Sequence, residues 1–382
     1  MRLLHTADWH LGRSFHNVSL IEDQAHVLRQ LVDLAREAEV DAVIVAGDVY
    51  DRAVPPPDAV RLLDETLAEL AMGLGIPVIM IAGNHDSAER LNFGSRLLAR
   101  ARCHIFGRLG ATPERVVLED DHGPVHILGL PYAEPSIVRE RTGAEDVHTH
   151  DAAMACLAAA AADQVPEAER SILVAHCFVA GGGESDSERP LSVGGAGSVS
   201  SAAFKPFDYT ALGHLHRPQS AGPNARYSGS LLKYSFSEVG HEKSVSLVEL
   251  DAAGAVSVEA VALKPRRDMR MIEGAFKDLL AGPGEGESAD DYLLVRLTDT
   301  QAILDPMGQL RAVYPHVLHL ERPALERAAQ APRYRPREGQ GDPELFASFF
   351  EQVTGEPISD EQSKAFNQLL EELGHAERET GQ

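Results

Sequence analysis

The chain has 382 residues, of which 44% are hydrophobic and 24% are charged, so it is long enough for two domains and has the composition of an ordinary globular protein. No stretch approaches the roughly 20 apolar residues that span a bilayer, and the first residues lack the apolar core of a signal peptide, so we expect a cytoplasmic protein without a membrane partner. The three cysteines have no CxxC spacing, which argues against a disulfide framework or a zinc-thiolate site.

The formal net charge at pH 7 is -23, whereas proteins that bind nucleic acids are normally basic. Bound divalent cations would offset some of the carboxylates. The rest of any positive field would have to come from a local patch or from a partner protein. Composition alone therefore favours a small substrate, or one that tolerates acidic surroundings.

Three short apolar runs near the start of the chain each stop at a cluster of polar side chains. The runs and the polar residues after them are 2–6 with Asp8 and His10, 42–46 with Asp48 and Asp51, and 77–82 with Asn84, His85 and Asp86. Apolar runs of this length, bounded by glycine, are typical of buried parallel strands. Because ligands bind at the carboxyl ends of such strands, we expect these side chains to lie along one edge of a sheet.

Helical periodicity fills the intervals between these strands. Apolar residues at helical spacing predict a helix within 21–39 and another over about 58–72, with Asp58 as its N-cap. Ser87 or Asp86 caps a third helix that ends near residue 100. Strands that alternate with helices predict a doubly wound α/β sheet with right-handed crossovers.

The middle of the chain predicts more strands. They are 125–130, 171–175 with His176 after it, 208–212 with His214 and His216 after it, 226–228, 244–250 and 256–262. We expect these strands to form a second sheet packed on the first, with an alanine-rich helix over 152–162. The run 181–201 is too rich in glycine and serine for regular structure, and a loop of this length is usually functional or disordered.

The character of the sequence changes near residue 265. We divide the chain into a first domain (1–265), a small α+β unit (266–322), a basic Pro-containing linker (323–342) and a helical segment (343–382). The small unit predicts a helix before Gly282, strands over 292–297 and 317–320, and a helix from about Asp299. The arginines around the linker fit either a solvated connector or a contact with a polyanion.

The C-terminal segment has apolar residues at helical spacing in two stretches and predicts two amphipathic helices. Ser359 caps the second one, and Glu361 or Gln362 completes the cap. Its phenylalanines form a large apolar surface for a chain terminus. This surface either packs on itself or docks on another protein.

Five predicted strand ends together offer carboxylate, imidazole and amide groups, which suit Mn, Fe, Zn or Mg. A single histidine at a strand end is usually a hydrogen-bonded core or surface residue, so the evidence is the whole set. Its size fits two adjacent metals with Asp48 as a shared ligand, an arrangement that stabilises the attacking and leaving oxygens in phosphoryl displacement. The candidate ligands are Asp8, His10, Asp48, Asn84, His176, His214 and His216.

These motifs resemble those of the calcineurin-like metallophosphoesterase superfamily. They are Asp8-x-His10, Gly47-Asp48-x-x-Asp51, Gly83-Asn84-His85-Asp86, His176 and Gly213-His214-x-His216. The resemblance implies a two-sheet α/β sandwich that holds one metal with Asp8, His10, Asp48 and His216, and the other with Asp48, Asn84, His176 and His214. His85 would face the scissile phosphate, to stabilise its charge or protonate the leaving oxygen. As a hypothesis, Asp51 orients His85.

Longer segments are similar to the SbcD family, the nuclease subunits of bacterial double-strand-break repair complexes whose ATPase partner is SbcC. The segments are 3–12, 185–193, 208–216 and 227–238. The resemblance implies manganese-dependent exonuclease and endonuclease action on DNA ends, single strands and hairpins in repair and recombination, with magnesium as the alternative metal. It makes 266–322 a capping domain that guides DNA and 343–375 the segment that docks on the ATPase.

The same resemblance implies a homodimer, and a heterotetramer with the ATPase. Helices over 58–72 or 87–100 are candidates for the dimer contact. Arg13, Ser14 and His16 follow the first ligand loop and are either DNA contacts or parts of a solvated loop.

Two other functions stay in view. A small-molecule phosphodiesterase or a protein phosphatase would use the same metals, but it would need neither a capping domain nor a phenylalanine-rich terminus. A scaffold that has lost its activity would lack ligands, whereas this sequence has the full predicted set.

Overall fold

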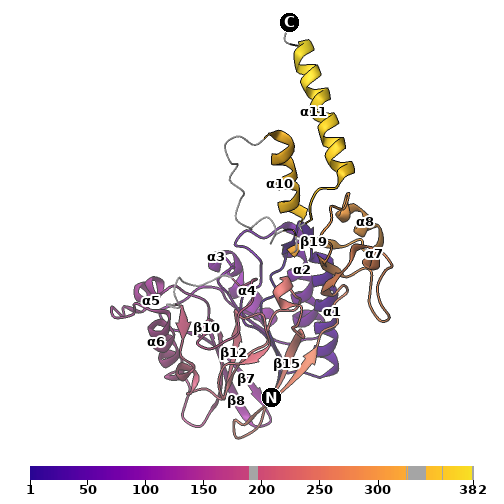
Figure 1. The fold of residues 1–382 in the computed structure, drawn as a ribbon. Coiled ribbons are helices and arrows are strands. Elements are labelled where there is room, and N and C mark those ends of the chain that lie inside the picture. Colours follow the sequence, from indigo (N-terminus) through magenta and orange to yellow (C-terminus); the bar gives the residue numbers. More distant parts are fainter. Residues whose placement is uncertain (189–196, 324, 326–340, 355, 381–382) are drawn as a thin grey trace. The chain divides into compact units, whose positions relative to one another are not determined.

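The computed structural model describes residues 1–188, 197–323, 325, 341–354 and 356–380 (Figure 1). The chain divides into two compact units, Met1–Asp268 and Met269–Gln382. Most of the predicted linker 323–342 and residues 189–193 of the segment 185–193 lie outside the described residues. Among the described residues, no helix is both long and apolar enough to cross a membrane.

The first unit contains two six-stranded mixed sheets. The first sheet has the order β16 (Val256–Ala262), β15 (Ser244–Leu250), β1 (Arg2–Thr6), β4 (Ala42–Val45), β5 (Val78–Ile81) and β6 (Cys103–Phe106). The second has the order β13 (Gln219–Ser220), β14 (Ala225–Tyr227), β12 (Tyr209–Gly213), β9 (Arg170–His176), β8 (Gly123–Leu130) and β7 (Glu114–Asp120).

The strands that precede the candidate ligands are parallel within each sheet. In the first sheet β1 pairs with β4 and β4 pairs with β5, in both cases in parallel. In the second sheet β9 and β12 are parallel and Gly213 lies opposite His176. Short two-stranded ribbons join β2 (Ser14–Phe15) to β3 (Val18–Ser19) and β10 (Phe178–Val179) to β11 (Ser198–Val199).

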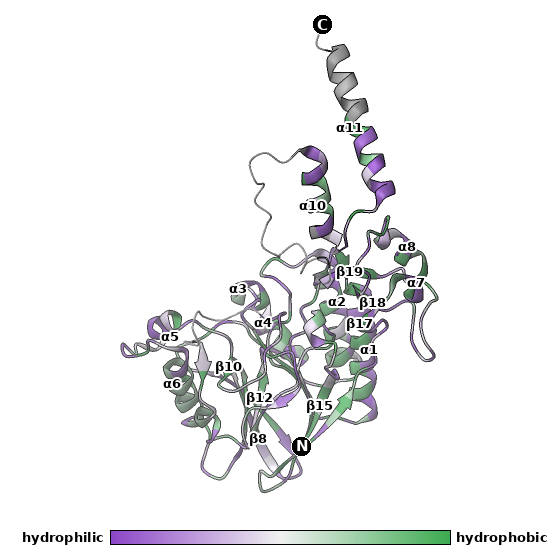
Figure 2. Cartoon of the chain, in the orientation of Figure 1, coloured by the Kyte–Doolittle hydropathy of each residue, from purple (hydrophilic) through white to green (hydrophobic). Residues whose placement is uncertain are grey.

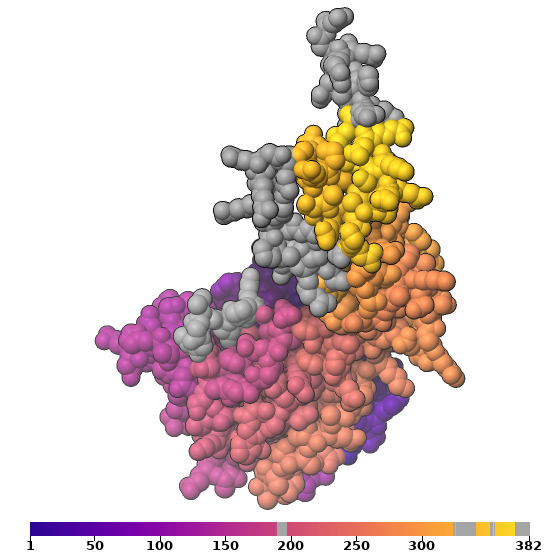
Figure 3. Space-filling model, in the orientation of Figure 1, coloured from indigo at the N-terminus to yellow at the C-terminus, as the bar shows by residue number. Residues whose placement is uncertain are grey.

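Helices cover both outer faces of the sheet pair, so the first unit is a layered α/β sandwich, with α1 and α2 on one side and α5 and α6 on the other (Figure 1). The helices are α1 (Ile21–Glu37), α2 (Pro57–Leu67), η1 (Ala68–Gly73), α3 (Ala88–Leu91), α4 (Ser95–Leu98), η2 (Ala99–Ala101), α5 (Pro135–Thr142), α6 (His150–Ala162), η4 (Ser201–Phe204) and η5 (Phe236–Glu238). Residues coloured magenta to salmon, from the second half of this unit, form most of its surface in Figure 3.

The core shows why β9 is apolar at every position of its centre. Ile172 and Val174 point into the space between the sheets, where they belong to one cluster with Ile44 of β4. Leu173 points the other way and packs in the cluster that contains Leu157 of α6. Because successive side chains of a strand face opposite sides, a strand covered on both faces needs apolar residues at all of them.

The assignment of two strands to the second sheet is wrong. Residues 244–250 and 256–262 form β15 and β16, which extend the first sheet through antiparallel pairing of β15 with β1. Periodicity identifies a strand but carries no information on the sheet that it joins. The fold class itself, a two-sheet α/β sandwich, is confirmed.

Two predicted helices also differ from the structure. Asp58 is not an N-cap, because the helix begins at Pro57, whose fixed φ and missing N–H suit a first helical position. Ser87 does cap the next helix, since its hydroxyl accepts from the Arg90 N–H at 3.4 Å. That helix is broken into two single turns, α3 and α4, at Gly94, which has a φ of 73°.

The second unit has a three-stranded parallel sheet in the order β17 (Met269–Gly274), β18 (Tyr292–Leu297) and β19 (Val317–Glu321). Its helices are α7 (Phe276–Leu279), α8 (Pro306–Val313), α10 (Asp342–Thr354) and α11 (Asp360–Thr380). β17 was not predicted, and α8 begins after its cap Asp305 rather than near Asp299. The predicted cap of α11 is confirmed, because Ser359 and Gln362 exchange hydrogen bonds of 3.0 and 3.3 Å.

Candidate metal centre

The candidate ligands lie at or directly after the carboxyl ends of β1, β4, β5, β9 and β12, as the sequence predicts. The ends of these strands meet at one edge of the two sheets, and the polar groups after them come within hydrogen-bond distance of one another. Of the seven candidate ligands, Asn84 is partly exposed and the other six are buried. Burying carboxylates and imidazoles together is energetically costly unless their charges are balanced.

The loops that carry these residues adopt backbone conformations that are rare outside glycine. Asp8, His10, Asp48 and His214 have φ values of 52°, 46°, 46° and 110°. Each such residue costs on the order of 1–3 kcal/mol, and strain of this kind collects at functional sites. The chain therefore turns sharply after β1, β4 and β12, and the turn brings the side chain into the site.

Two glycines of the motifs are required by packing. A Cβ at Gly83 would collide with the main chain and carboxylate of Asp48. A Cβ at Gly213 would collide with the carbonyl of Ala46. Both loops approach the end of β4 and the loop after it so closely that only glycine fits, which explains why the motifs pair a glycine with a ligand.

One group of ligands gathers around His10. Its Nε2 lies 3.0 Å from Nε2 of His216 and 3.7 Å from Oδ2 of Asp48. Ligand atoms of Asp8, His10 and His216 all lie within 4.8 Å of one another. Two imidazole nitrogens that face each other need a shared cation or proton between them, because two lone pairs repel.

A second group gathers around His176. Its Nε2 lies 2.9 Å from Oδ1 of Asn84 and 3.5 Å from Oδ2 of Asp48. His214 joins the group through Nδ1, which lies 3.2 Å from the same Asn84 oxygen. Asp48 Oδ2 therefore lies near histidines of both groups, as a shared ligand must.

Electrostatics in the protein without cations explain how these charges coexist. Burial opposes the charge of His176, but Asp48 outweighs that effect and raises the pKa of His176 to about 9. Burial would raise the pKa of Asp48, yet His176 and His10 hold it well below its usual range. Burial lowers the pKa of His214 to about 3 and raises that of Asp8 well above its usual range. A proton on His176 thus takes the place of positive charge that a cation would supply.

The residues fit two divalent cations. Oxygen and imidazole donors suit Mn, Fe, Zn or Mg, and the thiol nearest to the ligands, that of Cys177, is buried with its pKa raised to about 12. Nδ1 of His10 and Nδ2 of Asn84 are buried without a hydrogen-bond partner among the described residues. The other polar atom of each side chain contacts a candidate ligand: Nε2 of His10 faces His216, and Oδ1 of Asn84 faces His176.

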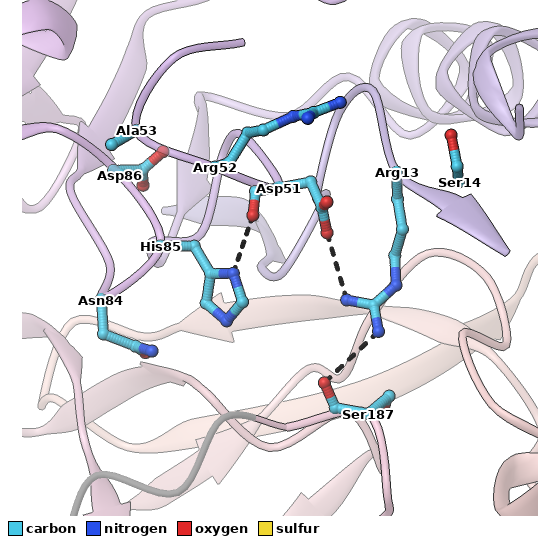
Figure 4. Close-up of a pocket in the computed structure, with 9 residues that line it drawn as sticks. All are labelled: Arg13, Ser14, Asp51, Arg52, Ala53, Asn84, His85, Asp86 and Ser187. Atoms are coloured by element: carbon cyan, nitrogen blue, oxygen red, sulfur yellow. Dashed lines mark hydrogen bonds and ion pairs between the residues drawn. The ribbon is translucent and has the colours of Figure 1, made fainter. Parts of the chain in front are cut away.

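A pocket of about 500 Å³ opens beside the ligands and is lined by His85, Asn84, Arg13, Arg52 and Ser187, among others (Figure 4). Nδ1 of His85 lies 2.8 Å from the main-chain carbonyl of Asp51, so this nitrogen donates and Nε2 is left free to act in the pocket. The main-chain N–H of His85 donates to Oδ1 of Asp48 at 2.8 Å, which connects this histidine to the shared ligand.

The Asp51 carboxylate does not contact His85 in the way that the hypothesis expects. It accepts from Nη1 of Arg13 at 3.2 Å (Figure 4). It also lies 3.6 Å from Nδ1 of His10. The contact to His85 comes from the main chain, which any residue at position 51 would provide. The side chain instead supports His10 and fixes Arg13 at the wall of the pocket.

Two further residues hold the ligand loops: Gln24, which sequence reasoning did not single out, and Asp86, which it named without this role. The fully buried Gln24 donates to the carbonyls of Trp9 and His10 at 3.1 and 2.7 Å. The carboxylate of Asp86 accepts from the N–H groups of Val49 and Gly83, which fastens the second loop to the third. The sequence offered one signal for such a residue, namely a polar side chain among the buried positions of a predicted helix, as at Gln24.

Comparisons with known proteins cover nearly all of the chain. The calcineurin-like phosphoesterase family matches residues 1–218, and the domain described as Type 5 capsule protein repressor C-terminal domain (SbcD_C) matches residues 265–354. The SbcD subunit of nuclease SbcCD from Staphylococcus epidermidis is 33% identical over 376 residues, which are 97% of this chain and 98% of that protein.

Two solved structures are also similar. A Thermus thermophilus protein has 16% identity over 68% of this chain and 98% of its own, with a TM-score of 0.37. A dimetal phosphatase from Danio rerio has 14% identity over 69% and 96%, with a TM-score of 0.40. The sequence similarities settle the family: this chain is a calcineurin-like phosphoesterase and belongs, over 97% of its length, to the family of the SbcD nuclease subunits.

Proposed function

We propose that the protein is a manganese-dependent DNA nuclease, with exonuclease action on duplex ends and endonuclease action on single strands and hairpins. The observation that carries this proposal is the similarity to a nuclease subunit over both units of the chain, combined with the pocket beside the ligand groups. A small-molecule phosphodiesterase explains the ligands equally well, but it gives no reason for the second unit. The DNA substrate would place the protein in the cytoplasm.

One cation would be held by Asp8, His10, Asp48 and His216, and the other by Asp48, Asn84, His176 and His214. When bound, the cations supply Lewis-acid charge to the phosphate and lower the pKa of water. Mn²⁺ is our first choice and Mg²⁺ the alternative, because both accept oxygen and imidazole donors.

His85 is the proposed catalytic residue. Its Nδ1–H is held by the Asp51 carbonyl, so Nε2 is presented to the pocket and, when protonated, can donate to the leaving oxygen of the phosphodiester. Arg13 forms an ion pair with Asp51, and its Cζ lies 4.9 Å from the centroid of the Tyr234 ring. The exposed Arg52 is therefore the better candidate for attracting the substrate phosphate.

The test compares a labelled hairpin duplex with a small phosphodiester, in the presence of Mn²⁺. We expect the wild type to cut the hairpin and His85→Ala to retain metal but lose cleavage by about 10²- to 10⁴-fold, the usual contribution of general acid–base catalysis. Hydrolysis of the small diester without any cleavage of DNA would contradict the nuclease proposal and leave the phosphoesterase chemistry standing.

We also propose that residues 343–375 dock on an SbcC-type ATPase. Phe349 and Leu369 have exposed fractions of 59% and 56%, although Phe346 and Phe366 on the same two helices stack on each other. Hydrophilic residues dominate the first turns of α11 (Figure 2). Co-purification with the ATPase partner, with and without residues 343–375, tests this assignment; equal binding of both forms would contradict it.

A homodimer is proposed through the surface of η1 and of the segment after β5. Met72 and Phe93 have exposed fractions of 77% and 84% and line an apolar pocket of about 320 Å³, and Leu97 is exposed by 77%. Apolar patches of this kind mark interaction sites. Sedimentation of the wild type and of Phe93→Asp should show a dimer and a monomer; a monomeric wild type would contradict the proposal. With the ATPase, such a dimer would make a heterotetramer.

A further inference from the structure

A cluster of buried polar groups lies behind His216, on the side away from His10. Nδ1 of His216 is 2.5 Å from Oγ of Ser187, a residue with an exposed fraction of 8%. The same hydroxyl contacts Oε1 of Glu238, which also lies 3.4 Å from Nδ1 of His216. These residues come from three separate segments of the chain, so their meeting is a tertiary feature.

Glu238 is fully buried and its charge is compensated. Oε2 of Glu238 accepts from Nζ of Lys243 at 2.5 Å, and Lys243 also donates to the His216 carbonyl at 2.7 Å. Because Oε2 is paired with the ammonium group of Lys243, the carboxylate is ionised and can only accept hydrogen bonds.

That ionised carboxylate decides the direction of the hydrogen bonds. Because Glu238 can only accept, the Ser187 hydroxyl donates to it, and the lone pair of Ser187 then accepts from the Nδ1–H of His216. The proton on Nδ1 leaves the lone pair of His216 on Nε2, the atom that faces His10 at 3.0 Å. A histidine that ligates a metal needs this tautomer.

The main chain around His216 is held as well. The His216 N–H donates to Oε1 of Glu188 at 2.8 Å. The carbonyl of Ser187 accepts from Nη2 of Arg13 at 3.4 Å, so the residue that contacts His216 also forms part of the pocket wall (Figure 4). Ser187 thus connects the ligand group with the substrate pocket.

We propose that Ser187 and Glu238 are positioning residues that fix the tautomer and orientation of His216, and that they set the affinity of the metal position that His216 serves without affecting the other position. The inference rests on the proposed two-metal function. Ser187 and Glu238 act through His216 and are ligands of neither metal. Hydrogen-bond partners of this kind change metal affinity by about 10- to 100-fold.

The experiment is calorimetric titration of the full chain with Mn²⁺, which resolves the two positions, together with thermal unfolding of the metal-free protein. For Ser187→Ala we expect one position to weaken by about 10- to 100-fold and the other to keep the wild-type affinity. Ser187→Thr keeps a hydroxyl and should restore binding. Glu238→Gln is less informative, because it leaves the buried Lys243 without its carboxylate.

Ser235→Ala is the matched control. Its hydroxyl contacts the same Glu238 oxygen at 3.5 Å and Ser237 at 2.6 Å, but its described partners do not include His216. We expect it to bind both metals like the wild type. The proposal is overturned if Ser187→Ala binds both metals normally, if it weakens both positions together, or if Ser235→Ala weakens the same position. A wild-type chain that binds no Mn²⁺ would instead overturn the two-metal function on which the inference rests.

Discussion

The metal edge of the first unit and the helical end of the second unit use polar and apolar groups in opposite ways. At the metal edge, buried charged groups satisfy one another from five strand ends, and His176 and Asp48 share one such contact at 3.5 Å. In the helices α10 and α11, one aromatic pair is stacked while Phe349 and Leu369 stay exposed. In the first region polar groups are buried and paired with one another, whereas the second region keeps apolar side chains exposed.

The largest effect is expected at the shared ligand. Asp48→Asn keeps the size of the side chain and tolerates the φ of 46° at this position, which alanine tolerates less well. Because both ligand groups depend on this carboxylate, we expect Mn²⁺ affinity at both positions to fall by more than about 100-fold, beyond the range for residues that only support ligands. Calorimetry measures the Mn²⁺ affinity of each position. If only one position lost its affinity, Asp48 would not be a shared ligand.

The pH dependence of metal binding should follow from His176. Its pKa is raised to about 9 in the metal-free protein, and the proton must leave before the nitrogen can bind a metal. Below about pH 9, Mn²⁺ affinity should therefore fall by up to about tenfold for each unit of decreasing pH, and rise with increasing pH. Titrations at pH 7 in buffers of different ionisation enthalpy should show proton release. Absence of released protons would contradict the charge state assigned to His176.

Asp51→Ala separates the two possible roles of this residue. The main-chain carbonyl that holds His85 remains, but His10 and Arg13 lose a carboxylate at 3.6 and 3.2 Å. We expect Mn²⁺ affinity to fall by about tenfold, together with turnover. If turnover falls while metal affinity is unchanged, the hypothesis that the Asp51 side chain serves His85 is supported instead. Asp51→Asn provides a control in which a hydrogen-bond acceptor is kept.

The smallest effects are expected in the helical end. The rings of Phe346 and Phe366 stack at 3.7 Å, so Phe346→Ala should lower the free energy of opening of α10 and α11 by about 0.5–1.5 kcal/mol or more, the range typical of an aromatic pair. Amide hydrogen exchange of the full chain measures this change. Phe349→Ala should alter exchange by less than about 0.5 kcal/mol while weakening binding of the ATPase partner. Similar exchange in both variants would remove the contrast between paired and exposed phenylalanines.

Local sequence patterns were sufficient for the strands that carry the candidate ligands. Apolar runs that stop at polar residues identify β1, β4, β5, β9 and β12, since a buried parallel strand must be apolar on both faces and must turn where it ends. The cap of α11 at Ser359 and Gln362 was also predictable, because it depends on residues that are neighbours in the sequence.

Relations between distant segments, in contrast, were set by the folded structure. Three such relations depend on the folded chain. β15 lies beside β1, and the Asp51 carboxylate contacts Arg13 rather than His85. Ser187 meets Glu238 behind His216. Periodicity reports which face of an element is buried, but the partner across that face is chosen by the packing of the whole unit. Local sequence therefore specifies which groups the metal edge contains, and the fold specifies which of them hold the others in place.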